Sequence, residues 1–223
     1  MKKIIAILLS FIMVMCMMPT ALVIASGNTY YVSPDGDDTN DGSEAQPWAT
    51  LCKAAQELQA GDTAIFKNGT YNEVQYTVFS NSGTDDAPIT IKAENKHGAI
   101  ISYAENLNRE KLDITKSYIT VQDFVITQEG SHETSKDILL NCGIGKGNEI
   151  EGCQIIGNKF YNVYEEGIKV KYVKNAVIKD NIVENSMREG MDIFGCIGAV
   201  IFGNKMIIGG FFVICDVKYI QWL

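Results

Sequence analysis

The sequence is poor in proline, histidine and positive charge. Only 4 of its 223 residues are proline, and none follows Pro88, which is typical of ladder-paired strands because proline cannot donate to a strand ladder. Lys and Arg number 19 against 27 Asp and Glu, which gives a net charge of −8. This deficit argues against nucleic acid as a partner. It remains compatible with binding to an anionic polymer, provided that Ca²⁺ mediates the contact.

The cysteines match no zinc or disulfide pattern. After residue 25 the chain has an odd number of them at irregular spacings: Cys52, Cys142, Cys153, Cys196 and Cys215. Zinc sites and disulfide frameworks need regular or paired spacings. We therefore expect no disulfide framework.

Residues 1–25 are predicted to be a secretory signal peptide. Lys2 and Lys3 precede an apolar run at residues 4–18, and small residues suited to cleavage lie near Ala25. A membrane anchor is the alternative, but the run is shorter than the roughly 20 residues that a span requires. Cleavage would remove two lysines and no acidic residue, taking the charge from −8 to −10. The sequence thus predicts a secreted protein, without stable membrane insertion after cleavage.

Residues 153–206 repeat with a period of 23. Segments beginning at Cys153, Ala176 and Ala199 align without gaps, and two of their columns are invariant. These columns are Ile155, Ile178, Ile201 and Asn158, Asn181, Asn204. A repeat of this length is typical of a solenoid, whose units bury their apolar sides only by stacking. We expect the Cys153/Ala176/Ala199, Ile and Phe160/Val183/Met206 columns to point inward, and the Asn column to form a structural turn with side chains bonded along the stack.

A second segment of the repeat carries charge. Glu166 and the strand that follows it align with Glu189 and its strand, so that Lys169 stacks on Asp192 and Glu165 on Arg188. In a strand of alternating side chains these residues point outward. The sequence thus predicts a patch of carboxylates with one Lys and one Arg on an exposed sheet. An ordinary set of surface ion pairs, worth roughly 0–1 kcal/mol, is the alternative.

The earlier half of the chain predicts a cap and a series of strands. Apolar residues at helical spacing predict a short amphipathic helix over residues 49–60, suited to cover the open first coil. The aspartate-rich stretch at 33–42 lacks the spacing of a calcium loop and is interpreted as a solvated turn. Strands are expected at residues 30–32, 63–66, 75–79, 88–92, 100–101, 112–114 and 118–126. The fold class is therefore all-β, a parallel β-helix over residues 28–206.

Five short motifs occur in order: YYVSPDG from Tyr30, QPWATLCKAA from Gln46, GDT from Gly61, NGTY from Asn68 and APITIK from Ala87. Together they resemble the opening of secreted right-handed parallel β-helix proteins of the pectate-lyase-like superfamily. Within this superfamily, the motifs are most similar to those of the family-nine pectate lyases and the alginate lyase/chondroitinase B group. The resemblance covers residues 29–206 and implies a polysaccharide-binding sheet face.

For activity, the resemblance implies β-elimination of an acidic polysaccharide with a basic residue as the base and Ca²⁺ on acidic ligands. Carried onto the charged patch, it makes Lys169 the base and Arg188 a clamp for the substrate carboxylate. Glu166, Glu189 and Asp192 become the Ca²⁺ ligands. The stacked pair Glu166 and Glu189 favours a cation, because like charges repel.

Three functions stay open at this stage: a secreted polysaccharide lyase, a non-catalytic module that binds glycans or displays a surface, and a truncated piece of a lyase. Residues 207–223 motivate the third, because they lose the 23-residue register and are almost uniformly apolar. We expect them to form an irregular tail. The chain is expected to be a monomer.

Overall fold

The computed structural model describes residues 27–104, 107, 110–130, 138–207 and 211–215, the last five by backbone alone. The predicted signal peptide lies outside these residues. Within them, no helix has both the length and the apolar character needed to cross a membrane.

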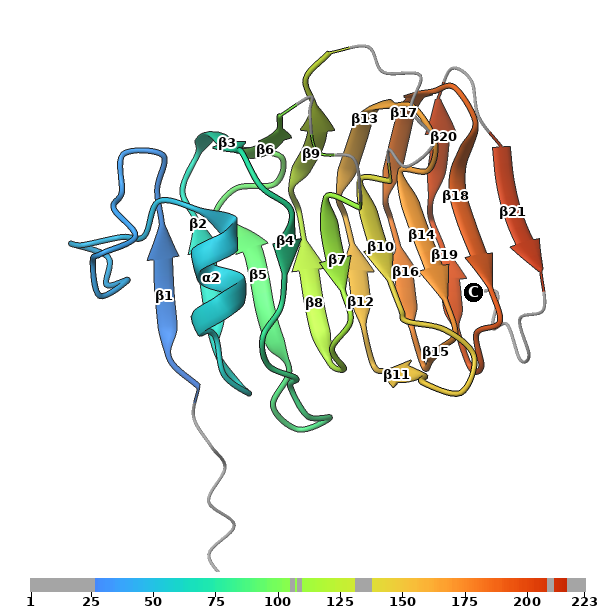
Figure 1. Ribbon diagram of the computed structural model, residues 1–223, viewed down its shortest axis with the longest axis horizontal. Coiled ribbons are helices and arrows are strands. Elements are labelled where there is room, and N and C mark those ends of the chain that lie inside the picture. Colours follow the sequence, from blue (N-terminus) through green and yellow to red (C-terminus); the bar gives the residue numbers. More distant parts are fainter. Residues whose placement is uncertain (1–26, 105–106, 108–109, 131–137, 208–210, 216–223) are drawn as a thin grey trace, which may run out of the picture.

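The described residues form a parallel β-helix in which each coil after the first adds one strand to each of three sheets (Figure 1). Sheet 1 contains β1 (Thr29–Val32), β2 (Thr63–Phe66), β5 (Ile89–Ala93), β8 (Ile119–Gln122), β12 (Gln154–Ile156), β16 (Val177–Lys179) and β19 (Val200–Phe202). Sheet 2 contains β3 (Gly69–Glu73), β6 (Ala99–Tyr103), β9 (Val125–Gln128), β13 (Lys159–Val163), β17 (Ile182–Ser186) and β20 (Lys205–Ile207). Sheet 3 contains β4 (Thr77–Val78), β7 (Leu112–Ile114), β10 (Leu140–Cys142), β14 (Ile168–Lys171), β18 (Glu189–Phe194) and β21 (Phe211–Cys215). Two short strands, β11 (Ile150–Glu151) and β15 (Val173–Lys174), pair at the corner between sheets 3 and 1. The predicted fold class is confirmed.

The 23-residue repeat corresponds to one coil. Ile155 lies beside Ile178 and Ile178 beside Ile201 in the sheet 1 ladder, and all three are at most 2% exposed. Cys153 is buried in line with Ala176 and Ala199, as expected for a small interior residue. It is a free thiol, as are Cys52, Cys142 and Cys196. Apolar columns stacked along the axis therefore make up the core of these coils.

The Asn column forms a hydrogen-bonded ladder at the corner between sheets 1 and 2. Asn158 Nδ2 donates to Asn181 Oδ1 at 3.2 Å, and Asn181 Nδ2 donates to Asn204 Oδ1 at 2.9 Å. Each Oδ1 also accepts the backbone N–H of the preceding coil's asparagine. The predicted structural role of this column is confirmed.

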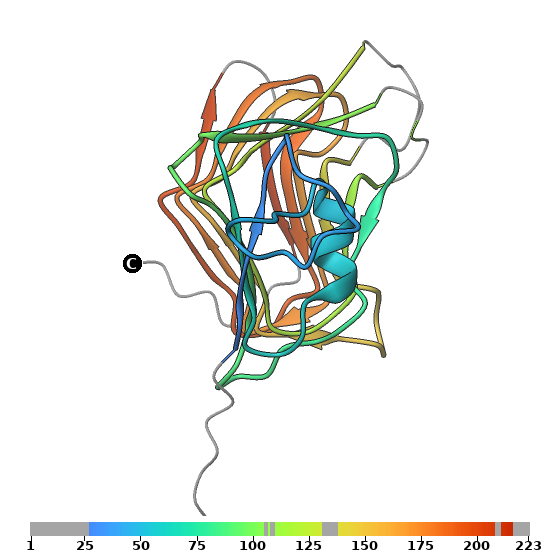
Figure 2. The same ribbon diagram turned by 90° about the vertical axis from the view of Figure 1, so that its left-hand side faces the viewer.

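The first coil is covered by α2 (Leu51–Glu57) and the loop before it (Figure 2). Thr50 caps the helix by accepting from the Lys53 N–H, and the apolar side of α2 is buried in the core. In the aspartate-rich loop, Asp38 accepts from the backbone of Ala49 and Thr50. The expected capping helix is confirmed, in a shorter form than residues 49–60.

Two expectations about strands were wrong. Residues 118–126 form two strands on different sheets, because Asp123 adopts a left-handed conformation with φ of 65° and turns the chain between β8 and β9. Strand β3 was not expected, because no strand was predicted between residues 67 and 74. Gly69 instead begins a strand with Tyr71 and Glu73 buried.

The tail after Met206 is more regular than expected. Strand β20 extends to Ile207, and β21 pairs with β18 in parallel, with Val213 beside Asp192. The partner of Glu189 is Phe211 but that of Met191 is Phe212, so a bulge absorbs one residue. This coil is shorter than 23 residues, and its shift conceals the repeat from sequence alignment. The expected loss of the 23-residue register is therefore observed, whereas the part of 207–223 that the structure describes contains a regular strand, β21, where an irregular tail was expected.

Candidate functional site

The outer face of sheet 3 carries a column of polar side chains. Asp113 on β7, Asn141 on β10, Lys169 on β14 and Asp192 on β18 are neighbours in successive coils. Each lies between two buried apolar residues of its own strand. Because side chains alternate along a strand, the four polar ones point away from the core.

Only part of this column is accessible. Asp113 and Asn141 are 9% and 2% exposed, so they are buried despite pointing outward. The side chains of Lys169 and Asp192 are 21% and 16% exposed. A ligand approaching this face therefore meets β14 and β18 first.

Lys169 bridges two of the predicted acidic residues. Its Nζ donates to Glu166 Oε1 at 2.9 Å and lies 3.7 Å from Asp192 Oδ2. The first partner precedes β14 and the second lies on the next coil. The predicted stacking of Lys169 on Asp192 is confirmed.

Arg188 forms the outer part of the same cluster. Its Nη1 donates to Glu165 Oε1 at 2.7 Å, and its Nε lies 3.6 Å from Glu189 Oε2. The arginine side chain is 59% exposed. We call the whole group the charged cluster: Glu165, Glu166, Lys169, Arg188, Glu189 and Asp192.

The local cause of the charged cluster is the equal length of two turns. Val163 on β13 pairs with Ser186 on β17, and Ile168 on β14 pairs with Met191 on β18. The connection between sheets 2 and 3 is therefore the same length in both coils. Charged residues at equal positions in these turns consequently stack at the same edge of sheet 3.

The carboxylates fit calcium in chemistry but are not arranged as a finished site. Glu166 Oε2 and Glu189 Oε2 are buried and have no hydrogen-bond partner, which suits a cation because Ca²⁺ prefers carboxylate oxygens. However, no group of three or more His, Cys, Asp or Glu side chains in the described part of the chain is placed to hold a metal ion. Lys169 lies between Glu166 and Asp192 instead.

The charged cluster shifts two pKa values. Burial lowers the pKa of Lys169, but the hydrogen bond and charge of Glu166, with the charges of Asp192 and Glu165, raise it overall. Burial raises the pKa of Asp192, and the charge of Lys169 opposes that rise. Lys169 is therefore held as an ammonium ion by its carboxylate neighbours.

Sequence reasoning missed Asp113 and Asn141. Their strands repeat the apolar–polar–apolar pattern of β14, but the pairs Asp113–Asn141 and Asn141–Lys169 are each 28 residues apart rather than 23. Asn141 Nδ2 donates to Asp113 Oδ1 at 2.6 Å, whereas Asn141 Oδ1 is buried without a partner. The three-residue pattern, rather than the period, was the signal that could have found them.

Comparison with known proteins gives relatives over part of the chain. "Uncharacterized protein YwoF" of Bacillus subtilis is 35% identical over 114 residues, which cover 47% of this chain and 24% of the relative. "Pectate lyase L" of Dickeya dadantii is 31% identical over 88 residues, which cover 36% of this chain and 20% of the relative. The matched segment thus spans at most a quarter of the length of either relative.

Among solved structures, the pectate lyase Pel9A superposes with a TM-score of 0.57 at 17% identity. The match covers 83% of this chain and 53% of the Pel9A chain. At this identity the likeness concerns the fold alone, a parallel β-helix. The family model described as "Pel9A-like, right handed beta helix region" matches residues 30–198. The chain therefore belongs to the Pel9A-like right-handed β-helix family.

Proposed function

We propose that this protein acts on or binds acidic polysaccharide at the charged cluster of sheet 3. The observation that carries the proposal is the stacking of Lys169 and Arg188 among carboxylates on adjacent coils. Cations suit the carboxylates of a polyuronate, and the surrounding acids suit a bridging cation. A relative named pectate lyase supports an anionic glycan as the ligand.

Arg188 is proposed to hold the substrate carboxylate. Its side chain is 59% exposed, while its partner Glu165 is only 15% exposed, so the guanidinium projects outward from its ion pair. A guanidinium presents two parallel N–H donors to a carboxylate, which gives both affinity and orientation. Lys169 lies deeper, with 21% of its side chain exposed.

In the catalytic form of this proposal, Lys169 removes the proton beside the substrate carboxylate, a C=C bond forms as the glycosidic C–O bond breaks, and the leaving sugar oxygen takes a proton from water. Ca²⁺ held by Glu166, Glu189 and Asp192 would supply the positive charge that makes this proton acidic. Lys169 must first lose its own proton, since a general base acts in its neutral form. The 2.9 Å contact with Glu166 opposes that loss, so Lys169 has to leave Glu166 before it acts.

A non-catalytic glycan-binding module is the alternative, and the same contact favours it. With Lys169 bonded to Glu166 and close to Asp192, the cluster is a set of mutually paired ions. Such a set can bind a charged polymer through Arg188 without transferring a proton. The two functions use the same face and differ in whether Lys169 is released.

The test is incubation with polygalacturonate, alginate and chondroitin sulfate, each with and without Ca²⁺. Unsaturated uronate products absorb in the ultraviolet, so elimination appears as a rise in absorbance. This rise should disappear in Lys169→Ala and persist in Lys171→Ala, a matched lysine two residues further along β14. Binding without any rise supports the module. Neither binding nor turnover on the three polymers overturns both forms.

We also propose that the protein is secreted after cleavage near Ala25. The proposal rests on the Lys2–Lys3 pair, the apolar run and the small residues before Ser26. N-terminal sequencing of protein from the culture medium should begin near Ser26. Material that stays cell-bound with Met1 intact would contradict it.

A further inference from the structure

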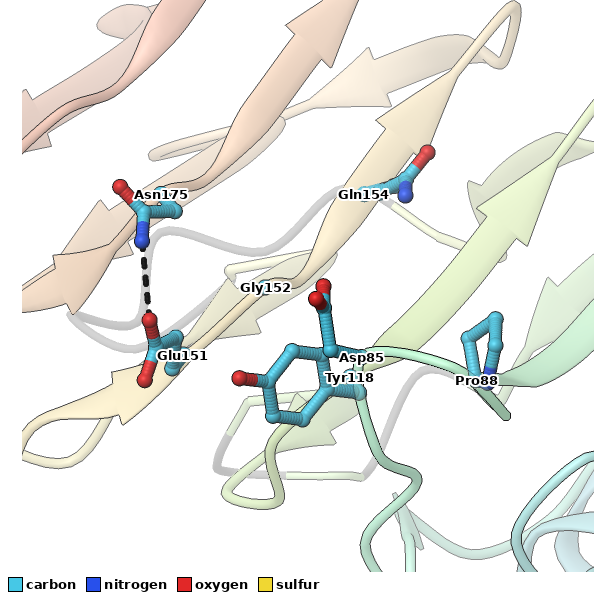
Figure 3. Close-up of a pocket in the computed structure, with 7 residues that line it drawn as sticks. All are labelled: Asp85, Pro88, Tyr118, Glu151, Gly152, Gln154 and Asn175. Carbon is cyan, nitrogen blue, oxygen red and sulfur yellow. Dashed lines mark hydrogen bonds between the residues drawn. The ribbon is translucent and has the colours of Figure 1, made fainter. Parts of the chain in front are cut away.

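A small pocket lies at the corner that leads into sheet 1 (Figure 3). Its volume is about 120 Å³, enough for part of one small ring. The lining comes from one loop and three successive coils: Asp85, Pro88, Tyr118, Glu151, Gly152, Gln154 and Asn175. None of these residues belongs to the charged cluster.

The Tyr118 ring forms the aromatic wall of the pocket. A backbone turn that recurs in successive coils positions this ring. Tyr118, Gly152 and Asn175 all have positive φ, at 56°, 69° and 52°. Their backbones are linked coil to coil, because the Tyr118 N–H donates to Glu151 O and the Gly152 N–H to Lys174 O. A Cβ on Gly152 would lie 2.3 Å from Tyr118 Cδ1, so the ring lies directly against the glycine. The absent side chain at Gly152 thus makes room for the aromatic ring.

The polar wall offers hydrogen-bond acceptors and an amide. Asn175 Nδ2 donates to Glu151 Oε1 at 2.8 Å, which fixes that carboxylate (Figure 3). The side chains of Asp85 and Gln154 make no hydrogen bond to the described residues. Two carboxylates and no basic side chain line the pocket. An anionic sugar would therefore be repelled here, whereas hydroxyl groups would find acceptors.

The Tyr118 hydroxyl adds a donor. Desolvation raises its pKa, and the charges of Glu151 and Asp85 and a side-chain interaction with Glu151 raise it further, so the phenol keeps its proton. The pocket thus combines the aromatic ring and hydroxyl of Tyr118, the carboxylates of Asp85 and Glu151, and the side-chain amide of Gln154. Aromatic rings bind apolar C–H faces, and the polar groups fix orientation.

We propose that this pocket binds one uncharged sugar ring, with its C–H face against Tyr118 and its hydroxyls on Asp85, Glu151 and Gln154. The uncharged ring distinguishes this ligand from the acidic polymer proposed for sheet 3. The pocket residues lie on sheet 1 and its corner turns, whereas Lys169 lies on β14 of sheet 3. The inference stands independently of the proposed function, since no residue is shared.

The test is an amide-resolved NMR titration of the full chain with methyl β-galactoside, methyl β-glucoside and methyl β-xyloside. We expect shifts clustered at residues 85–88, 118 and 151–154 for at least one of them, with a dissociation constant on the order of millimolar. Galacturonate should bind at least roughly tenfold more weakly, because the pocket carries only negative charge.

Two variants should weaken sugar binding about tenfold or more: Tyr118→Ala removes the aromatic wall, and Asp85→Asn changes an exposed acceptor without affecting the core. Tyr172→Ala is the matched control, because Tyr172 also has positive φ and lies against a glycine, Gly195, but outside the pocket. Lys169→Ala should bind the sugars unchanged even if it loses every activity on acidic polymers. Absence of shifts with all three glycosides, equal effects of Tyr118→Ala and Tyr172→Ala, or the same shifts at the pocket residues produced by CaCl₂ alone would each overturn the proposal.

Discussion

Replacing Asn181 by alanine tests whether the asparagine ladder holds the coils together. Asn181 is completely buried. Its Oδ1 accepts from the backbone N–H of Asn158 at 3.0 Å and from Asn158 Nδ2 at 3.2 Å. Its Nδ2 donates to Ile155 O at 2.8 Å and to Asn204 Oδ1 at 2.9 Å. Alanine removes all of these bonds at once.

The expected loss follows from the groups left behind. The Asn158 N–H and the Ile155 carbonyl both lose their contact with Asn181 at a buried corner. An unsatisfied buried group costs about 1–3 kcal/mol, and a carbonyl with a second lone pair costs less than an N–H. We therefore expect Asn181→Ala to lower the free energy of unfolding by about 3 kcal/mol. Asn204→Ala, at the half-buried end of the ladder, should cost about 1 kcal/mol because water can replace part of the loss.

Urea unfolding followed by far-UV circular dichroism measures both variants. The midpoint should move further for Asn181→Ala than for Asn204→Ala, with the same dependence on urea, because the surface exposed on unfolding is unchanged. Equal midpoints for the two variants would refute the reasoning. If both midpoints also equalled that of the unchanged protein, the stack would be stabilised by its apolar columns alone.

Three further predictions concern the cap and the two sites. Burial raises the pKa of Glu73 to about 7, with Leu51 N–H donating to it, so its contribution to stability is present below pH 4.5 and is lost as pH rises through about 7. Glu73→Gln should reduce the change in the free energy of unfolding between pH 4 and pH 8 by up to about 3 kcal/mol. The same pH dependence in the variant and the unchanged protein would contradict this prediction. Arg188→Gln should weaken binding of acidic polysaccharide several-fold, less so as salt rises, in calorimetry with Lys179→Gln as control. Gly152→Ala should abolish sugar binding to the pocket by displacing the Tyr118 ring, as glycoside titration would show.

The regular half of the fold could be predicted from sequence because its coils are equal in length. Gln154, Val177 and Val200 are register partners at intervals of 23 residues. Upstream, the partners Thr63, Thr90 and Thr120 stand at unequal intervals of 27 and 30. Unequal loops conceal register from any fixed-period alignment. There the strands had to be predicted one at a time, so the strand that begins at Gly69 and the turn at Asp123 were both missed.

The candidate site, like the fold, could be predicted only where successive coils are equal in length. Lys169 and Asp192 belong to equal coils, so their stacking followed from the period, and the structure confirms it. Asn141 lies 28 residues before Lys169 and was missed for that reason. The burial of the outward-pointing Asp113 and Asn141 could not be predicted from the sequence, because alternation gives the direction of a side chain but not what covers it. The pocket at Tyr118 depends on left-handed backbone conformations in separate coils, which no spacing rule reveals.

The charged cluster makes binding and elimination depend on one contact. Glu166 uses one oxygen for Lys169 and leaves the other buried without a partner. A cation bound to that carboxylate and the ammonium of Lys169 would be attracted by the same negative charge. Binding of the cation would therefore weaken the contact between Glu166 and Lys169. Arg188 is not paired with Glu166, although one of its two partners, Glu189, is also a proposed Ca²⁺ ligand. The arrangement therefore permits polymer binding as it stands, whereas elimination requires that Lys169 and Glu166 first separate.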